Sequence, residues 1–163
     1  MDSFSVVLQS YNQESYGTPT LVTYLGTAMS IEQKIYDSAL ELLKRRYPKG
    51  DGYAAAVRIE SGKILTSVPP DTKNNSLEVC IELGAYLEAF KLDEAVTHSL
   101  CIYRENEHSE IIILSPCGIC QERLVYWGGD VKAAISTKDN ALTFKTIREL
   151  MPYHWSLVNG ETL

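Results

Sequence analysis

Segments patterned like strands alternate with segments patterned like helices along most of the chain. From Ile31 the apolar residues recur at helical spacing, and Ser30 and Gln33 predict an N-cap with a capping box. Residues 53–60 and 63–68 flank a Ser-Gly turn and predict a β-hairpin. Because a sheet with interleaved helices buries both of its faces, this order predicts a three-layer α/β/α fold.

Beyond the hairpin the same patterns continue. They predict a helix beginning near Ser76 (76–92), strands over 99–104 and 110–114, a buried helix over 118–127, strands over 132–136 and 142–145, and a short helix that includes 147–150. A chain of 163 residues is most simply one domain. We interpret the weakly patterned residues 1–28 as an N-terminal extension and residues 29–163 as the folded domain.

The charge of the chain argues against nucleic acid as a partner. The net charge is −6, and the densest basic cluster, residues 44–49, closes a predicted helix, where cations favourably meet the helix dipole. No apolar run is long enough to cross a bilayer, and no cation precedes Lys34, which argues against a secretory or transit peptide. We therefore expect a cytoplasmic protein whose partner is a small molecule.

Three cysteines carry the strongest chemical signal. Cys117 and Cys120 form a Cys-x-x-Cys pair, and Cys80 lies 37 residues before Cys117, also at the start of a predicted helix. A thiol redox pair, a structural zinc site and a catalytic zinc site all use such residues. Glu82 favours the catalytic alternative, because a carboxylate beside a zinc ligand accepts protons without binding the metal. Cys101, inside a predicted strand, is interpreted as a core thiol.

The pattern Cys80-Ile81-Glu82 followed by Ser115-Pro116-Cys117-Gly118-Ile119-Cys120-Gln121 resembles the zinc-dependent cytidine deaminases, whose signature places Cys or His before the Glu. The all-cysteine form is similar to the small tetrameric cytidine deaminases and blasticidin S deaminases that act on free nucleosides. The resemblance extends from Ile31 to Trp155. It implies the cytidine deaminase-like sandwich, with a mixed sheet of about five strands.

The resemblance also implies a mechanism and a set of residues. Cys80, Cys117 and Cys120 would hold one zinc ion, and Glu82 would move protons while water replaces the amino group of cytidine or deoxycytidine. Backbone around Ile81 and Pro116 would bind the ring, and Trp155 stands where the family has a pocket aromatic. A homotetramer and a role in pyrimidine salvage are further implications.

Two features depart from the family pattern, the ribose-binding motif and the Arg after the catalytic Glu. Counted without gaps, the ribose-binding Asn and Glu of the family fall on Pro69 and Asp71, and Asn74 lies near enough to contribute. The Arg that often follows the catalytic Glu is Leu83 here, and Arg123 is a candidate substitute. The altered ribose motif leaves a cytosyl-nucleoside antibiotic or a modified cytidine open as the substrate.

Overall fold

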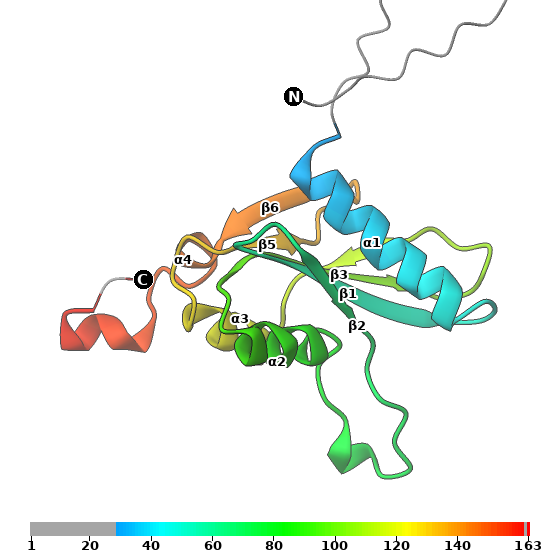
Figure 1. Cartoon of the computed structure of the whole chain (residues 1–163), viewed down its shortest axis with the longest axis horizontal. Helices are drawn as coiled ribbons and strands as arrows, with labels where there is room; N and C mark the ends of the chain where they lie inside the picture. The colour runs from blue at the N-terminus through cyan, green and yellow to red at the C-terminus, as the bar shows by residue number, and fades with distance from the viewer. Residues whose placement is uncertain (1–28, 162) are drawn as a thin grey trace, which may run out of the picture.

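A mixed sheet of six strands forms the centre of the protein (Figure 1), in a computed structural model that describes residues 29–161 and 163. The continuous order is β2-β1-β3-β5-β6, and β4 pairs with β3 outside that order. The pairing of β3 with β5 is parallel and the others are antiparallel. The strands are β1 (Gly52–Ile59), β2 (Ile64–Ser67), β3 (Val96–Arg104), β4 (Ile112–Leu114), β5 (Lys132–Ile135) and β6 (Thr143–Thr146).

Helices cover both faces of the sheet, so the three-layer prediction is confirmed. One face carries α1 (Ile31–Arg46), and the other carries α2 (Leu83–Leu92) and α3 (Gly118–Val125) (Figure 1). Each interface has its own apolar core: Ile35 and Leu43 anchor the α1 side, while Ala85 and Leu124 lie on the α2–α3 side. Near the C-terminus follow the short helix α4 (Ile147–Leu150) and the 3-10 turn η2 (Trp155–Asn159).

The start of α1 confirms half of its prediction. Ser30 is the N-cap, and its hydroxyl accepts the backbone N–H of Gln33 at 3.1 Å. The capping box is wrong, because the Gln33 side chain donates to Asp37 at 2.9 Å instead of reaching back to the cap. The helix ends at Arg46, with its basic residues in the last turn as expected.

The predicted helix over residues 76–92 is wrong in its first half. Only Asn75–Leu77 is helical there, as the 3-10 turn η1, and α2 begins at Leu83. The Asn74 side chain accepts the Ser76 N–H and so caps this short turn. Residues 78–82 then form the connection to α2. Cys80 therefore lies in the approach to a helix, and Glu82 is its N-cap residue.

None of the helices in the described part of the chain has the length and apolar character needed to cross a membrane. Residues 1–28, interpreted above as an extension, lie outside the described residues.

Candidate active site

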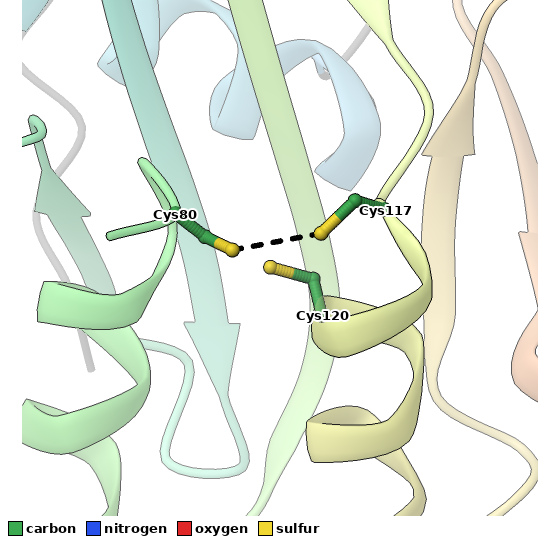
Figure 2. A group of neighbouring side chains, drawn as sticks. All are labelled: Cys80, Cys117 and Cys120. Carbon is green, nitrogen blue, oxygen red and sulfur yellow. Dashed lines mark hydrogen bonds between the residues drawn. The ribbon is translucent and has the colours of Figure 1, made fainter. Parts of the chain in front are cut away.

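Three thiols converge between the starts of α2 and α3. Figure 2 shows the sulfurs of Cys80, Cys117 and Cys120 pointing toward one another. The Sγ atoms of Cys80 and Cys117 are 3.5 Å apart, and all three sulfurs lie within 4.8 Å of one another. None of the three is in a disulfide. The two segments are distant in sequence, and they lead into α2 and α3, which cover the same face of the sheet (Figure 1).

Helix α3 gives its two cysteines different environments. Cys117 is the N-cap of α3, and although its partial burial opposes ionisation, hydrogen bonds from the backbone N–H groups of Cys120 and Ile119 and from neighbouring thiols hold the pKa of Cys117 below its ordinary value. Burial, followed by the charge of Glu82, raises the pKa of the Cys120 thiol. Several acidic groups lie close together in this cluster, and a bound cation would balance the negative charge that they carry when ionised.

Glu82 is the buried carboxylate of the cluster, with only 5% of its surface exposed. Its charge is the second cause, after burial, of the raised pKa values of Tyr86 and Cys101. The Tyr86 hydroxyl is in turn hydrogen-bonded to Ser99 at 2.8 Å. Glu82 is therefore a buried carboxylate at the start of α2, two residues after Cys80.

A hydrogen bond from the end of β2 holds the segment between the first cysteine and Glu82. The Ser67 hydroxyl donates to the carbonyl oxygen of Ile81 at 2.7 Å. A Cβ atom on Gly84 would lie 3.0 Å from the Ser67 Cβ, so glycine allows this close approach of α2 to the strand. Nothing in the sequence around Ser67 predicted this anchor, because the bond joins residues 14 positions apart.

The three thiols fit a zinc ion. Tetrahedral zinc with Zn–S distances of about 2.3 Å requires sulfurs separated by roughly 3.8 Å. The observed separations, 3.5 Å for one pair and no more than 4.8 Å for the set, are compatible with this requirement. Thiolates are also the donors that zinc favours. Three protein ligands leave a fourth coordination position for a small molecule, as in catalytic zinc sites.

The predicted substrate-binding residues lie in several places. Asp71 and Ile81 line one cavity beside the Cys80 segment. Asp71 is also paired with Arg46 at 3.3 Å, and Asn74 caps η1. The Pro116 carbonyl accepts a hydrogen bond from Gln121 at 2.8 Å, which fixes the approach to Cys117.

Trp155 is the first residue of η2, with 65% of its surface exposed. Its indole N–H donates to Glu122 at 3.2 Å, and the other oxygen of that carboxylate is 3.0 Å from the buried His154 ring. Glu122 therefore ties the C-terminal turn to the helix that carries Cys120. No sequence pattern predicts this contact, since 32 residues separate Glu122 from His154.

Two other predicted positions are clear in the structure. Cys101 is 4% exposed in the middle of β3, which confirms a core thiol. Arg123 lines an apolar groove together with Leu83, the residue that replaces the family's Arg. One terminal nitrogen of Arg123 is buried without a hydrogen-bond partner among the described residues.

Comparison with solved structures identifies relatives of this arrangement. The chain is similar to the crystal structure of the cytidine deaminase from Bacillus anthracis, with 53% identity and a TM-score of 0.79 over 80% of this chain and 94% of that one. The chain belongs to the cytidine deaminase family. This finding confirms the resemblance read from Cys80-Ile81-Glu82 and the Cys-x-x-Cys pair. Members of this family are hydrolases.

More distant cytidine deaminases have the same fold. The enzyme from Mycobacterium leprae is 17% identical with a TM-score of 0.57, over 74% of this chain and 96% of that one. The enzyme from Burkholderia pseudomallei is 15% identical with a TM-score of 0.58, over 76% and 98%. Comparison with protein-family models and with curated proteins gave no match.

Proposed function

We propose that this chain catalyses the hydrolytic deamination of cytidine and deoxycytidine to uridine and deoxyuridine, with release of ammonia. The observation that carries the proposal is the convergence of three thiols with one buried carboxylate, Glu82, at two helix starts. A structural zinc site needs no carboxylate beside its ligands, and a redox pair needs no third thiol. The family relationship at 53% identity supports the same reaction.

Cys80, Cys117 and Cys120 hold one zinc ion per chain as thiolates. Bound there, zinc supplies the Lewis acidity that makes water a nucleophile near neutral pH. The protein's own groups carry out proton transfer and hold the substrate.

Glu82 is the proton carrier of the reaction. It takes a proton from the attacking water and delivers it to N3 of the cytosine ring as the water oxygen bonds to C4. It then takes the remaining proton of that oxygen and gives it to the amino group, which leaves as ammonia. The burial of Glu82 suits this role, because it excludes bulk water from competing for its protons.

The cytosine ring lies against backbone around Ile81 and Pro116. Both segments are held in place, since the Ile81 carbonyl is bound by Ser67 and the Pro116 carbonyl by Gln121. Asp71, Asn74 and Trp155 complete the proposed set of substrate-binding residues.

The functional form is a homo-oligomer, a tetramer by resemblance to the family. An apolar groove of about 240 Å³ between α2 and α3 supports association between copies. Its rim carries Leu87, Phe90 and Tyr126, each more than half exposed in the single chain.

The setting follows from the substrate. A free nucleoside is a small molecule, and the net charge of −6 disfavours binding to nucleic acid. We place the protein in the cytoplasm, in pyrimidine salvage.

Residues 29–163 are the catalytic domain, and residues 1–28 are an extension. Expressing 29–163 alone tests this division, and an insoluble or misassembled product would show that the extension is part of the fold.

A cytosyl-nucleoside antibiotic of the blasticidin S kind, or a modified cytidine, is the second candidate substrate. Pro69 and Asp71, in place of the family's ribose-binding residues, favour it. Turnover of cytidine and blasticidin S, measured side by side by loss of cytosine absorbance and release of ammonia, tests both. Faster turnover of the antibiotic at equal concentration would replace the first candidate by the second.

A further inference from the structure

The position of Glu82 depends on the first turn of α2. Glu82 is the N-cap residue of this helix, but its carboxylate makes no capping hydrogen bond and so does not fix its own place. Two backbone bonds define the turn. The Leu83 N–H donates to the Cys80 carbonyl and the Tyr86 N–H donates to the Glu82 carbonyl, each at 3.1 Å. Whatever holds this turn therefore also holds Glu82.

Tyr86 connects the turn to the central sheet. Its hydroxyl is hydrogen-bonded to the Ser99 hydroxyl of β3 at 2.8 Å. Both residues are buried, each with only 3% of its surface exposed. Because no water can replace a partner that is lost in such a place, the pair is held in one arrangement. We call the hydrogen-bonded pair Tyr86 and Ser99 the α2–β3 link.

The Tyr86 ring also packs toward the helix that carries the other two cysteines. Its centroid is 5.9 Å from that of the Trp127 ring, and the two planes are tilted by 57°, an arrangement in which aromatic rings attract each other. Trp127 stands two residues beyond the end of α3. Tyr86 and Cys120 belong to the same apolar core, and Cys80 packs against that core. One side chain thus contacts both β3 and the end of α3, while its backbone is bonded to Glu82.

Tyr86 has no group to offer a substrate directly. It is almost fully buried, and Ser99 engages its hydroxyl. Burial, followed by the charge of Glu82, raises the pKa of the Tyr86 phenol well above its ordinary value, so the phenol keeps its proton near neutral pH. A contribution of Tyr86 to the reaction therefore acts through Glu82.

We propose that Tyr86 is a positioning residue for deamination, and that its bond to Ser99 fixes Glu82 relative to the three cysteines. The proposal rests on the proposed role of Glu82 as the proton carrier. Ile81, against which the cytosine ring is proposed to lie, has its own anchor in the Ser67 hydroxyl. Loss of the α2–β3 link should therefore lower kcat and leave KM nearly unchanged.

The test removes each partner of the link singly and then both together. Tyr86→Phe and Ser99→Ala each delete one hydroxyl, and the double variant deletes the pair. Because small displacements of a catalytic group are costly, each single variant is expected to lower kcat for cytidine about tenfold, with KM within about twofold of the wild type. The double variant should lose no more than either single variant, since all three remove the same bond.

Ile35→Val is the matched control. Ile35 is also fully buried, but it lies in the core on the α1 side of the sheet. The variant loses stability through packing alone and is expected to keep the kcat and KM of the wild type. Zinc content, measured for every protein, gives kcat per zinc-loaded site, and melting temperatures establish that every protein is folded at the assay temperature.

Amide hydrogen exchange over residues 80–92 gives a second readout that does not depend on turnover. Exchange reports local opening, so it should be faster in this segment of Tyr86→Phe than in the same segment of Ile35→Val.

Three results would overturn the positioning role: wild-type kcat in Tyr86→Phe, a KM that rises as much as kcat falls, or the same loss of kcat in Ile35→Val. Wild-type kcat in Tyr86→Phe beside an inactive Glu82→Gln would reject the positioning role alone. A wild type that does not turn over cytidine would reject the proposed reaction, and the positioning role with it. Unchanged exchange over residues 80–92 in Tyr86→Phe would then reject the α2–β3 link as well.

Discussion

Replacing Ser67 by alanine should weaken the positioning of Cys80 and Glu82, although Ser67 is not a member of the cysteine cluster. The Ser67 hydroxyl donates at 2.7 Å to the carbonyl of Ile81, which lies between the proposed ligand Cys80 and the proposed proton carrier Glu82. Alanine keeps the Cβ that packs on Gly84 and removes only the hydroxyl. The carbonyl, in a partly buried position, loses its donor, which costs about 1–2 kcal/mol. For a domain of this size that is a fall of roughly 2–8 °C in melting temperature.

The loss of catalytic activity should be larger than the loss of stability. Because small displacements of catalytic groups are costly, we expect kcat to fall about tenfold or more. Thermal unfolding, zinc content and cytidine turnover of the variant provide the assay. Ser38→Ala is the matched control, since the Ser38 hydroxyl also donates to a carbonyl, that of Lys34, but on the exposed side of α1. A Ser67→Ala protein with the melting temperature and kcat of the control would refute the reasoning.

Three further predictions concern ligands, core and charge. Cys101→Ala should keep one zinc per chain by plasma emission spectroscopy, whereas Cys120→Ala should lose it; equal zinc in both would contradict the ligand set. Tyr86→Phe should destabilise the protein by about 1–2 kcal/mol in urea unfolding, because the buried Ser99 hydroxyl loses its partner. Lys145, then the Thr146 backbone and hydroxyl, lower the pKa of Glu149 to about 2. A carboxylate whose pKa is lowered in the folded protein stabilises the fold at pH values above its ordinary pKa, and this stabilisation is lost as the pH falls toward 2. The free energy of unfolding of the wild type should therefore exceed that of Glu149→Gln at pH 7 and approach it near pH 2. A difference that is the same at both pH values would contradict this.

Local signals predicted most of the fold. The Ser30 cap, the helical spacing after Ile31 and the Ser-Gly hairpin all correspond to observed elements. The error over residues 76–82 has a physical cause. Propensity favours a helix there, but the segment adopts a connecting conformation that places Cys80 within reach of Cys117, so tertiary structure overrides local preference.

The chemistry of the site could be predicted from residue types and spacing, but its surroundings could not. Cysteines and a glutamate at this spacing indicate a metal site, because few other roles require these residues together. Ser67 and Glu122 are ordinary residues whose importance comes from contacts with distant segments. Such contacts leave no pattern in a single sequence.

The most direct test of the account is turnover of cytidine by the zinc-loaded protein beside its Glu82→Gln variant, with uridine and ammonia both quantified. We predict one ammonia per uridine from the wild type. The variant should retain one zinc per chain, and its rate should fall by a factor of about 10² to 10⁴, the usual contribution of a general acid–base group. A variant that turns over cytidine at the wild-type rate, or a zinc-loaded wild type that yields no uridine, would contradict the central claim.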